Sequence, residues 1–374
     1  MFSITTLLLF LLVLSVLVFV HELGHFLAAR RSGMRVDEFG FGFPPKIFGI
    51  KRGETLYSIN AIPLGGFVRI HGESGQDRDN ERSFANKSIP KRLMVLAAGV
   101  IMNMLLAMVL LSVGLMIGLP TAIDGDNVPA GATVSERVIR VVSVLQDSPA
   151  NLAGVEPGDI LLSIDQNEVS STDAARDYIG ANGGEGIHLE VLRGEEKVGI
   201  DVTSASVAEL ATPGIGVGLI DTATISYGPF RAVFEGVKAS FVMAYDIFAT
   251  FFDLIKQLVF TRTIDAEISG PVGIAVLTGE AASLGFAYLL QFAAVLSINL
   301  AVLNLLPIPA LDGGRILFVL IEVIRRKPNN AQVEGIVHGV GMLCLMGLIA
   351  LVTYHDIVRF GGSILGAFRS FVGI

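Results

Sequence analysis

The stretch ITTLLLFLLVLSVLVFV (Ile4–Val20), followed directly by HELGH (His21–His25), decides the fold. The first part is long and apolar enough to enter a lipid bilayer as a helix. Ionisable side chains are costly in hydrocarbon, so the cluster at its end needs a specific role. Positions i and i+4 lie on one helix face, so His21 and His25 can bind one zinc ion while Glu22 faces the adjacent water. We therefore predict a zinc site on a membrane helix.

Composition extends this prediction to the whole chain. Of 374 residues, 52% are hydrophobic and 17% are charged, which is typical of a polytopic membrane protein. No disulfide can form within the chain because Cys344 is the only cysteine. The net charge is −8 and no basic cluster is interleaved with aromatic residues, so we expect no nucleic-acid partner. Four stretches are long and apolar enough to span a bilayer: Ile4 to Ala29, Leu93 to Leu119, Phe286 to Leu306 and Val337 to Tyr354.

Basic residues indicate the orientation of these helices. They gather between the first and second stretches and again between the third and fourth, and the positive-inside rule makes both connections cytoplasmic. Both termini and the segment Pro120 to Leu284 then face the other side. Phe230 to Phe260 is apolar but interrupted by charges, so we expect an amphipathic helix on the membrane surface, although entry into the bilayer stays open.

The third zinc ligand should come from another spanning segment at matching depth. Asp312 follows the third stretch, which runs in the same direction as the first, so its carboxylate is expected at the level of the two histidines. Pro307 and Pro309 should break the helix there and expose backbone, as an active-site cleft requires. Two alternatives remain open: Asp312 can simply end the helix in an Asp-Gly turn, and His338 is a rival ligand.

Two β-rich segments interrupt the apolar pattern. Val138 to Ser204 has short alternating runs between turns, and Ser148 to Asp165 resembles the helix, turn and strand of bacterial PDZ domains, which bind peptides or act only as steric barriers. A generic β domain is the alternative. Leu56 to Ile62 and Phe67 to Ile70, joined by Pro63 to Gly66, predict a β-hairpin. Its free edge, with Gly65, Gly66 and Phe67, either pairs with an unwound substrate or merely packs against the helices.

Taken together, these motifs resemble the bacterial site-2 protease family of intramembrane zinc metalloproteases. The resemblance rests on HELGH, on LDGGR (Leu311–Arg315), on the PDZ-like insert, and on Tyr227 to Phe230 and Ile268 to Gly273. It departs from relatives that carry two PDZ units, since only one fits here. The expected fold is a polytopic α-helical membrane protein with four transmembrane helices, a membrane-associated β-hairpin and one inserted PDZ-like domain. Its expected parts are residues 1–119, 120–222, 223–284 and 285–374.

The resemblance also implies an activity. It makes His21, His25 and Asp312 the ligands of Zn²⁺, Glu22 the catalytic carboxylate, and Asn304 a contact of the substrate backbone, or else a polar residue that bonds a neighbouring helix. The expected substrates are single-pass membrane proteins, such as an anti-sigma factor or leftover signal peptides, cut in the inner (cytoplasmic) membrane after an upstream site-1-type protease. The PDZ-like domain would be extracytoplasmic and the active site near the cytoplasmic face. A PDZ scaffold with a relic site and a zinc transporter are the alternatives.

Overall fold

The computed structural model describes residues 4–75, 77–123, 130–145, 147–182, 184–194, 196–204, 214–260 and 269–372. The chain forms two compact units. The first unit contains Met1–Ser112, Val233–Ala282 and Leu289–Ile374. The second contains Val113–Ala232 and Ser283–Tyr288, so it begins within a helix that the first unit starts.

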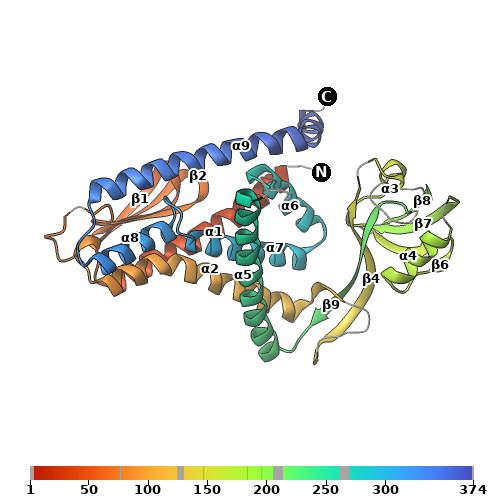
Figure 1. Cartoon of the computed structure of the whole chain (residues 1–374), viewed down its shortest axis with the longest axis horizontal. Helices are drawn as coiled ribbons and strands as arrows, with labels where there is room; N and C mark the ends of the chain where they lie inside the picture. The colour runs from red at the N-terminus through yellow and green to blue at the C-terminus, as the bar shows by residue number, and fades with distance from the viewer. Residues whose placement is uncertain are drawn as a thin grey trace. The chain divides into compact units, whose positions relative to one another are not determined.

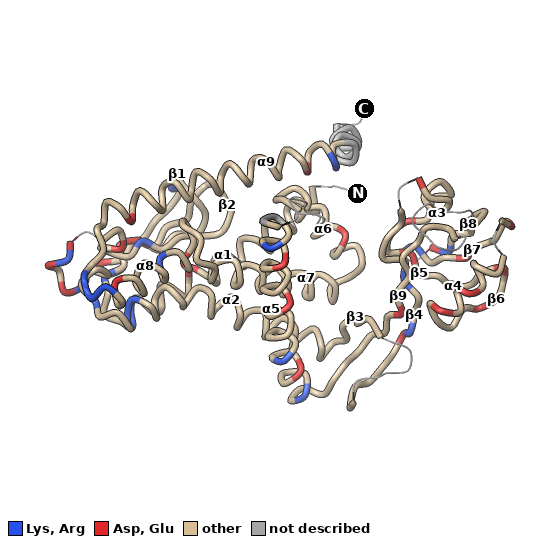
Figure 2. Tube along the Cα trace, viewed as in Figure 1, with Lys and Arg blue, Asp and Glu red and all other residues tan. Residues whose placement is uncertain are grey.

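Within the described residues, four helices are long and apolar enough to cross a membrane, and each overlaps one of the predicted stretches. They are α1 (Ile4–Arg31), α2 (Ile89–Ile117), α7 (Phe286–Leu305) and α9 (Ala331–Val372). In α9 the candidate membrane span ends at Arg359. Figure 1 shows α1, α2, α7 and α9 running in similar directions, and Figure 2 shows that charged residues gather toward one end of them. This distribution suits helices whose middle parts lie in hydrocarbon.

Glycine allows α1 and α2 to approach closely next to the HELGH motif. A methyl group on Gly24 would lie 2.7 Å from Cγ of Met102 and still closer to the carbonyl oxygen of Ala98. Small residues permit such backbone contact between membrane helices, where no hydrophobic effect drives association. The two histidines of α1 are therefore held directly against α2.

The predicted hairpin is wrong in its pairing. Strands β1 (Val36–Arg52) and β2 (Thr55–Ile70) form an antiparallel two-stranded sheet with several register shifts. Residues 36–41 of β1 pair with 66–70 on one side, and residues 38–41 also pair with 56–59. The two segments expected to pair with each other are thus separated by the start of β1. Alternation along a strand identifies its faces but does not identify its neighbours.

An apolar cluster fixes this sheet against the helices. Phe26 of α1 stacks on Phe39 of β1 with ring centroids 4.7 Å apart, and both belong to one buried cluster. The cluster also includes Ile70 of β2, Val95 of α2 and Val319 of α8 (Asp312–Arg325). Five elements that are distant in sequence are therefore packed together beside the HELGH motif.

The segment Phe230 to Phe260, predicted as a helix, forms α5 (Pro229–Phe260), and a further helix, α6 (Pro271–Ser283), follows it. Figure 1 shows α5 running across the direction of α1, α2 and α7. Gly236 of α5 packs on Ser112 of α2, while Phe241, Tyr245 and Phe252 are exposed. The motif that begins at Ile268 leads into α6, although Ile268 itself lies outside the described residues.

The second unit is built on a seven-stranded sheet. The strand order is β3-β9-β4-β5-β7-β8, and β6 pairs with β5. Ser148 caps the short helix α3 (Pro149–Ala153), Gly154 ends it in the left-handed conformation, and β5 (Ile160–Ile164) follows, as predicted from the sequence. The remaining elements are β3 (Leu119–Ala122), β4 (Thr133–Val144), β6 (Asn167–Glu168), α4 (Thr172–Ala181), β7 (Gly186–Arg193), β8 (Glu196–Thr203) and β9 (Val217–Ser226). Strand β9, beyond the predicted β-rich segment, pairs along β4.

A buried carboxylate in α9 holds the start of α6. Asp356 is 2% exposed, and it accepts hydrogen bonds from the backbone N–H of Gly270 at 3.2 Å and of Gly273 at 2.8 Å. These are donors of the first turn of a helix, which has no internal acceptors for them. The carboxylate also interacts favourably with the positive end of the α6 dipole.

We predict that Asp356→Leu destabilises the protein because two buried N–H groups lose their acceptor, at a cost of about 1–3 kcal/mol each. Thermal unfolding of the full chain in detergent measures the effect, and Asp356→Asn, which retains one acceptor oxygen, should lose less. His355→Leu is the matched control because His355 is exposed on the neighbouring position. Equal unfolding temperatures for the Asp356→Leu and His355→Leu variants would contradict the capping role.

Candidate metal centre

Asp312 reaches the site because the chain breaks after α7. Helix α7 ends at Leu305, Pro307 and Pro309 follow, and α8 begins at Asp312. Asp312 therefore starts a helix instead of ending one. Gly313 and Gly314 come next, and side chains there would collide with carbonyl oxygens of residues 305, 306 and 308. The two glycines thus allow α8 to begin tightly against the broken end of α7.

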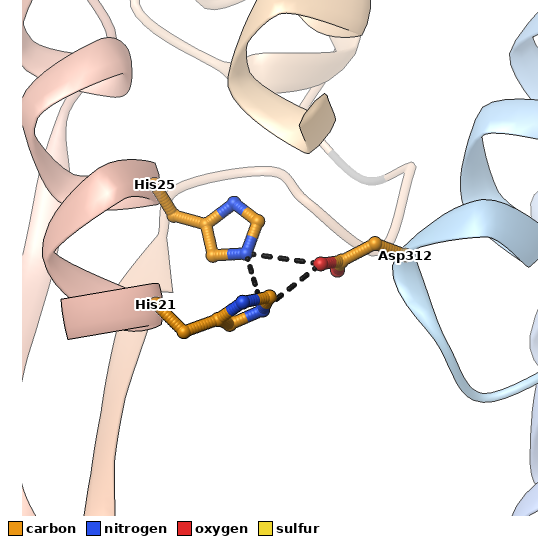
Figure 3. Close-up of side chains that lie close together, drawn as sticks. All are labelled: His21, His25 and Asp312. Atoms are coloured by element: carbon orange, nitrogen blue, oxygen red, sulfur yellow. Dashed lines mark hydrogen bonds and ion pairs between the residues drawn. The ribbon is translucent and has the colours of Figure 1, made fainter. Parts of the chain in front are cut away.

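Three metal-binding atoms converge at this point (Figure 3). Nε2 of His21 lies 3.1 Å from Nε2 of His25, and the two nitrogens lie 3.0 and 3.2 Å from Oδ2 of Asp312. The structure thus brings together the three side chains predicted from sequence as ligands. Both histidines are buried. In a tetrahedral zinc site with bonds of about 2.0–2.1 Å, the ligand atoms are about 3.3 Å apart. The observed triangle is close to that size.

The hydrogen bonds around the three atoms leave lone pairs free to bind a cation. Nδ1 of His25 lies 2.8 Å from the carbonyl oxygen of Val95, which can only accept, so Nδ1 carries the hydrogen and Nε2 presents a lone pair. Oδ2 of Asp312 is buried without a hydrogen-bond donor. Electron pairs therefore face one another at the centre, and a metal ion fits there.

Glu22 lies beside the triangle and is oriented by the sheet. Its Oε2 accepts a hydrogen bond of 3.0 Å from the backbone N–H of Val68 in β2. The predicted substrate contacts Gly65, Gly66 and Phe67 directly precede Val68, and Gly65 packs on Val18 of α1 with φ of +105°. Asn304 is half-buried in the last turn of α7. Because the N–H of Val68 donates to Glu22 and not to β1, this edge of the sheet faces the metal centre.

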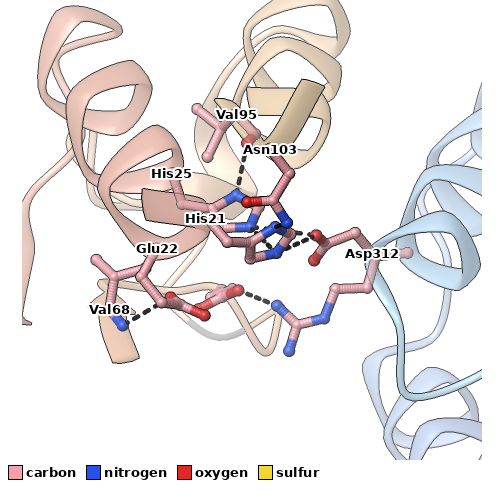
Figure 4. A network of polar contacts seen from close by, with 9 residues as sticks. His21, Glu22, His25, Val68, Val95, Asn103 and Asp312 are labelled. Atoms are coloured by element: carbon pink, nitrogen blue, oxygen red, sulfur yellow. Dashed lines mark hydrogen bonds and ion pairs between the residues drawn. The ribbon is translucent and has the colours of Figure 1, made fainter. Parts of the chain in front are cut away.

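Sequence analysis missed the contribution of α2. Val95, Gly99 and Asn103 recur every four residues along one face of this helix, and Figure 4 shows Val95 and Asn103 next to the two histidines. A methyl group on Gly99 would lie 2.5 Å from Cε1 of His21 and 2.5 Å from Nε2 of His25. Nδ2 of Asn103 lies 3.4 Å from Nδ1 of His21. A glycine and an amide at this spacing, opposite an HExxH helix, were the available signal.

The rival ligand His338 lies outside the triangle. Its Nδ1 accepts a hydrogen bond of 3.0 Å from the backbone N–H of Ala310, two residues before Asp312. Ala310 has φ of +80°, a conformation that a residue with a side chain rarely adopts. His338 therefore stabilises the strained connection between α7 and α8, which positions Asp312.

We predict that Gly99→Ala weakens zinc binding by about tenfold or more, an effect of the size seen when outer-shell partners of metal ligands are changed. The added methyl group collides with both imidazoles, whereas helix propensity alone favours alanine over glycine by about 1 kcal/mol. Competition with a chromogenic chelator measures the affinity. Gly347→Ala in α9, where the new methyl group meets open space, is the control. Equal affinities for the two variants would disprove the steric argument.

Comparison with known proteins finds relatives that match over most of the chain. The chain is 37% identical to a putative zinc metalloprotease of Clostridium perfringens over 93% of this chain and 97% of that protein. It is 34% identical to a putative zinc metalloprotease of Agrobacterium fabrum, with 93% and 94% of the two chains covered. It is 32% identical to zinc metalloprotease RasP of Geobacillus kaustophilus, with 94% and 97% covered.

Part of the chain is also similar to a solved structure. The PDZ domain of the SdrC-like protein of Listeria monocytogenes matches 23% of this chain and 92% of that domain, with 28% identity and a TM-score of 0.22. Across most of the chain, a family model matches residues 9–348, and its description is peptidase family M50. The four apolar helices of the described chain overlap that match, and the HELGH motif and Asp312 lie within it, so the chain belongs to peptidase family M50.

Proposed function

We propose that this protein is an intramembrane zinc endopeptidase that cleaves unwound transmembrane segments of single-pass membrane proteins. As a member of the site-2 protease family, it is a zinc metalloendopeptidase and a multi-pass membrane protein. The convergence of His21, His25 and Asp312 within 3.2 Å of one another carries the proposal. These three residues would hold Zn²⁺ through two Nε2 atoms and one carboxylate oxygen.

Glu22 is assigned as the catalytic carboxylate. Bound zinc supplies a Lewis acid that activates water and polarises the scissile carbonyl group. Glu22 takes a proton from the attacking water and passes it to the leaving amide nitrogen. The hydrogen bond from Val68 occupies one carboxylate oxygen, Oε2, and leaves Oε1 to accept that proton. The backbone of β2 therefore orients the base.

The edge of β2 is assigned as the substrate-binding strand. A transmembrane helix must unwind before hydrolysis because its carbonyl groups are hydrogen-bonded and shielded by side chains. An extended segment can then pair with an exposed strand edge, which supplies main-chain hydrogen bonds. We assign Gly65, Gly66 and Phe67, which directly precede the contact between Val68 and Glu22, to this pairing. Gly65 and Gly66 are buried, so this stretch would have to open to the substrate. Asn304, near the end of α7, would contact the substrate backbone.

The membrane arrangement follows the charge distribution. The basic connections between α1 and α2 and between α7 and α9 would be cytoplasmic, so cleavage would take place near the cytoplasmic face of the inner membrane. The second unit would be an extracytoplasmic PDZ-type domain that excludes substrates with bulky outer domains. An upstream site-1-type protease would remove that bulk from an anti-sigma factor, or leave signal-peptide remnants as substrates. Helix α5 would lie on the membrane surface, with its exposed Phe241, Tyr245 and Phe252 in lipid.

We predict that Glu22→Gln lowers kcat by about 10²- to 10⁴-fold because the proton acceptor is lost. Zinc content should stay stoichiometric, since Glu22 is not one of the three ligand side chains. Cleavage of a single-pass model substrate in detergent and atomic absorption provide the two readouts. Glu196→Gln on strand β8 serves as control. Full activity of the Glu22→Gln variant would refute its assigned role.

A second prediction concerns the strand edge. Val68→Pro removes the N–H that orients Glu22, and we expect kcat/KM to fall about 10- to 100-fold through loss of alignment. Zinc affinity should be unchanged. Val68→Ala retains the N–H and should keep near-normal activity. If the proline and alanine variants cleave equally well, the edge of β2 does not serve the reaction.

A further inference from the structure

Asn103 is the most deeply buried polar group next to the metal centre, and the proposed mechanism leaves it without a role. Its side chain is fully buried in the middle of α2, and its Oδ1 has no hydrogen-bond partner. Its Nδ2 lies 3.4 Å from Nδ1 of His21. A buried polar atom without a partner costs about 1–3 kcal/mol, so a residue that served only close packing would not be an amide.

The proton on His21 shows which amide atom belongs at this contact. When His21 binds metal through Nε2, its Nδ1 carries a hydrogen and needs an acceptor. The NH₂ group of Asn103 is a donor, so two donors face each other while the amide oxygen stays unpaired. The oxygen and nitrogen of an amide have nearly the same shape, and their placement follows from the hydrogen-bond network. Rotating the amide by half a turn removes both conflicts.

We propose that Asn103 is a positioning residue whose Oδ1 accepts a hydrogen bond from Nδ1–H of His21. This inference rests on the proposed zinc site. The bond keeps His21 in the tautomer that presents the Nε2 lone pair to the metal and fixes the rotation of its ring. Asn103 thereby does for His21 what the Val95 carbonyl, 2.8 Å from Nδ1, does for His25.

The surroundings hold Asn103 in place for this task. The hydroxyl of Ser297 in α7 donates a hydrogen bond of 2.8 Å to the backbone carbonyl of Asn103, and both residues are buried. Along α2, the Val95 carbonyl and the Asn103 side chain are eight residues apart, and Gly99 lies between them. The absence of a side chain at Gly99 leaves room for the two imidazole rings of α1. One face of α2 therefore forms an outer shell for both histidine ligands.

The test compares zinc affinities of the full chain in detergent by competition with a chromogenic chelator. Asn103→Leu has similar size and no acceptor, and we expect zinc binding to weaken about 10- to 100-fold. Asn103→Asp restores an acceptor oxygen and should bind zinc within a few-fold of the wild type. Asn299→Leu is the matched control because that amide lies in a spanning helix and, among the described residues, donates a hydrogen bond to the carbonyl of Val295 in its own helix.

The outcomes separate this inference from the proposed function. If the wild type holds no stoichiometric zinc, the proposed metal centre is overturned. If the wild type binds zinc and Asn103→Leu binds it as tightly as Asn299→Leu, only the positioning role is overturned. The role is also overturned if Asn103→Asp loses as much affinity as Asn103→Leu. Thermal unfolding of the metal-free protein shows whether the Asn103→Leu variant is folded. If it is not, the Asn103→Asp variant still decides, because a loss of zinc affinity of more than tenfold contradicts the acceptor role.

Discussion

Three electron-rich atoms must meet in a place that holds little water, and the rest of the first unit is arranged around this constraint. His21 and His25 come from α1 and Asp312 from α8, almost three hundred residues later in the chain. In a buried site, a carboxylate and two imidazole lone pairs repel one another unless a cation lies between them. The close contact at Gly24 and the gap at Gly99 provide the space for this meeting.

A series of contacts links α1, β2 and α8 around the metal centre, and Figure 4 shows Glu22, Val68, the two histidines and Asp312 among them. Glu22 of α1 accepts from Val68 in β2. The turn after β2 carries Glu73, which forms an ion pair with Arg315 of α8, three residues beyond Asp312. Asp312 then returns to the histidines of α1. The sheet therefore contacts Glu22 directly and, through Glu73 and Arg315, the helix that carries Asp312.

The strand pairing of the β1–β2 sheet and the role of α2 could not be predicted from the sequence. Alternating residues in 56–62 and 67–70 correctly indicated β structure, but the partner between them, residues 36–41, is joined through many register shifts that no local pattern encodes. The helix predicted at Phe230 to Phe260 is present as α5, whereas α6, which begins at Pro271, was not predicted as a separate helix. Asn103 and Gly99 give no local sign of a metal site because their sequence neighbours are uniformly apolar.

The sequence by itself determined the four apolar helices, the i and i+4 spacing of His21 and His25, and the break at Pro307 and Pro309 that precedes Asp312. These features follow from side-chain hydropathy, helical periodicity and the missing N–H of proline, all of which are local. Only the tertiary structure decided that Val68 orients Glu22, that His338 supports Ala310 and that one face of α2 surrounds the histidines. Those contacts join segments far apart in the chain, and their geometry arises only when close packing brings the segments together.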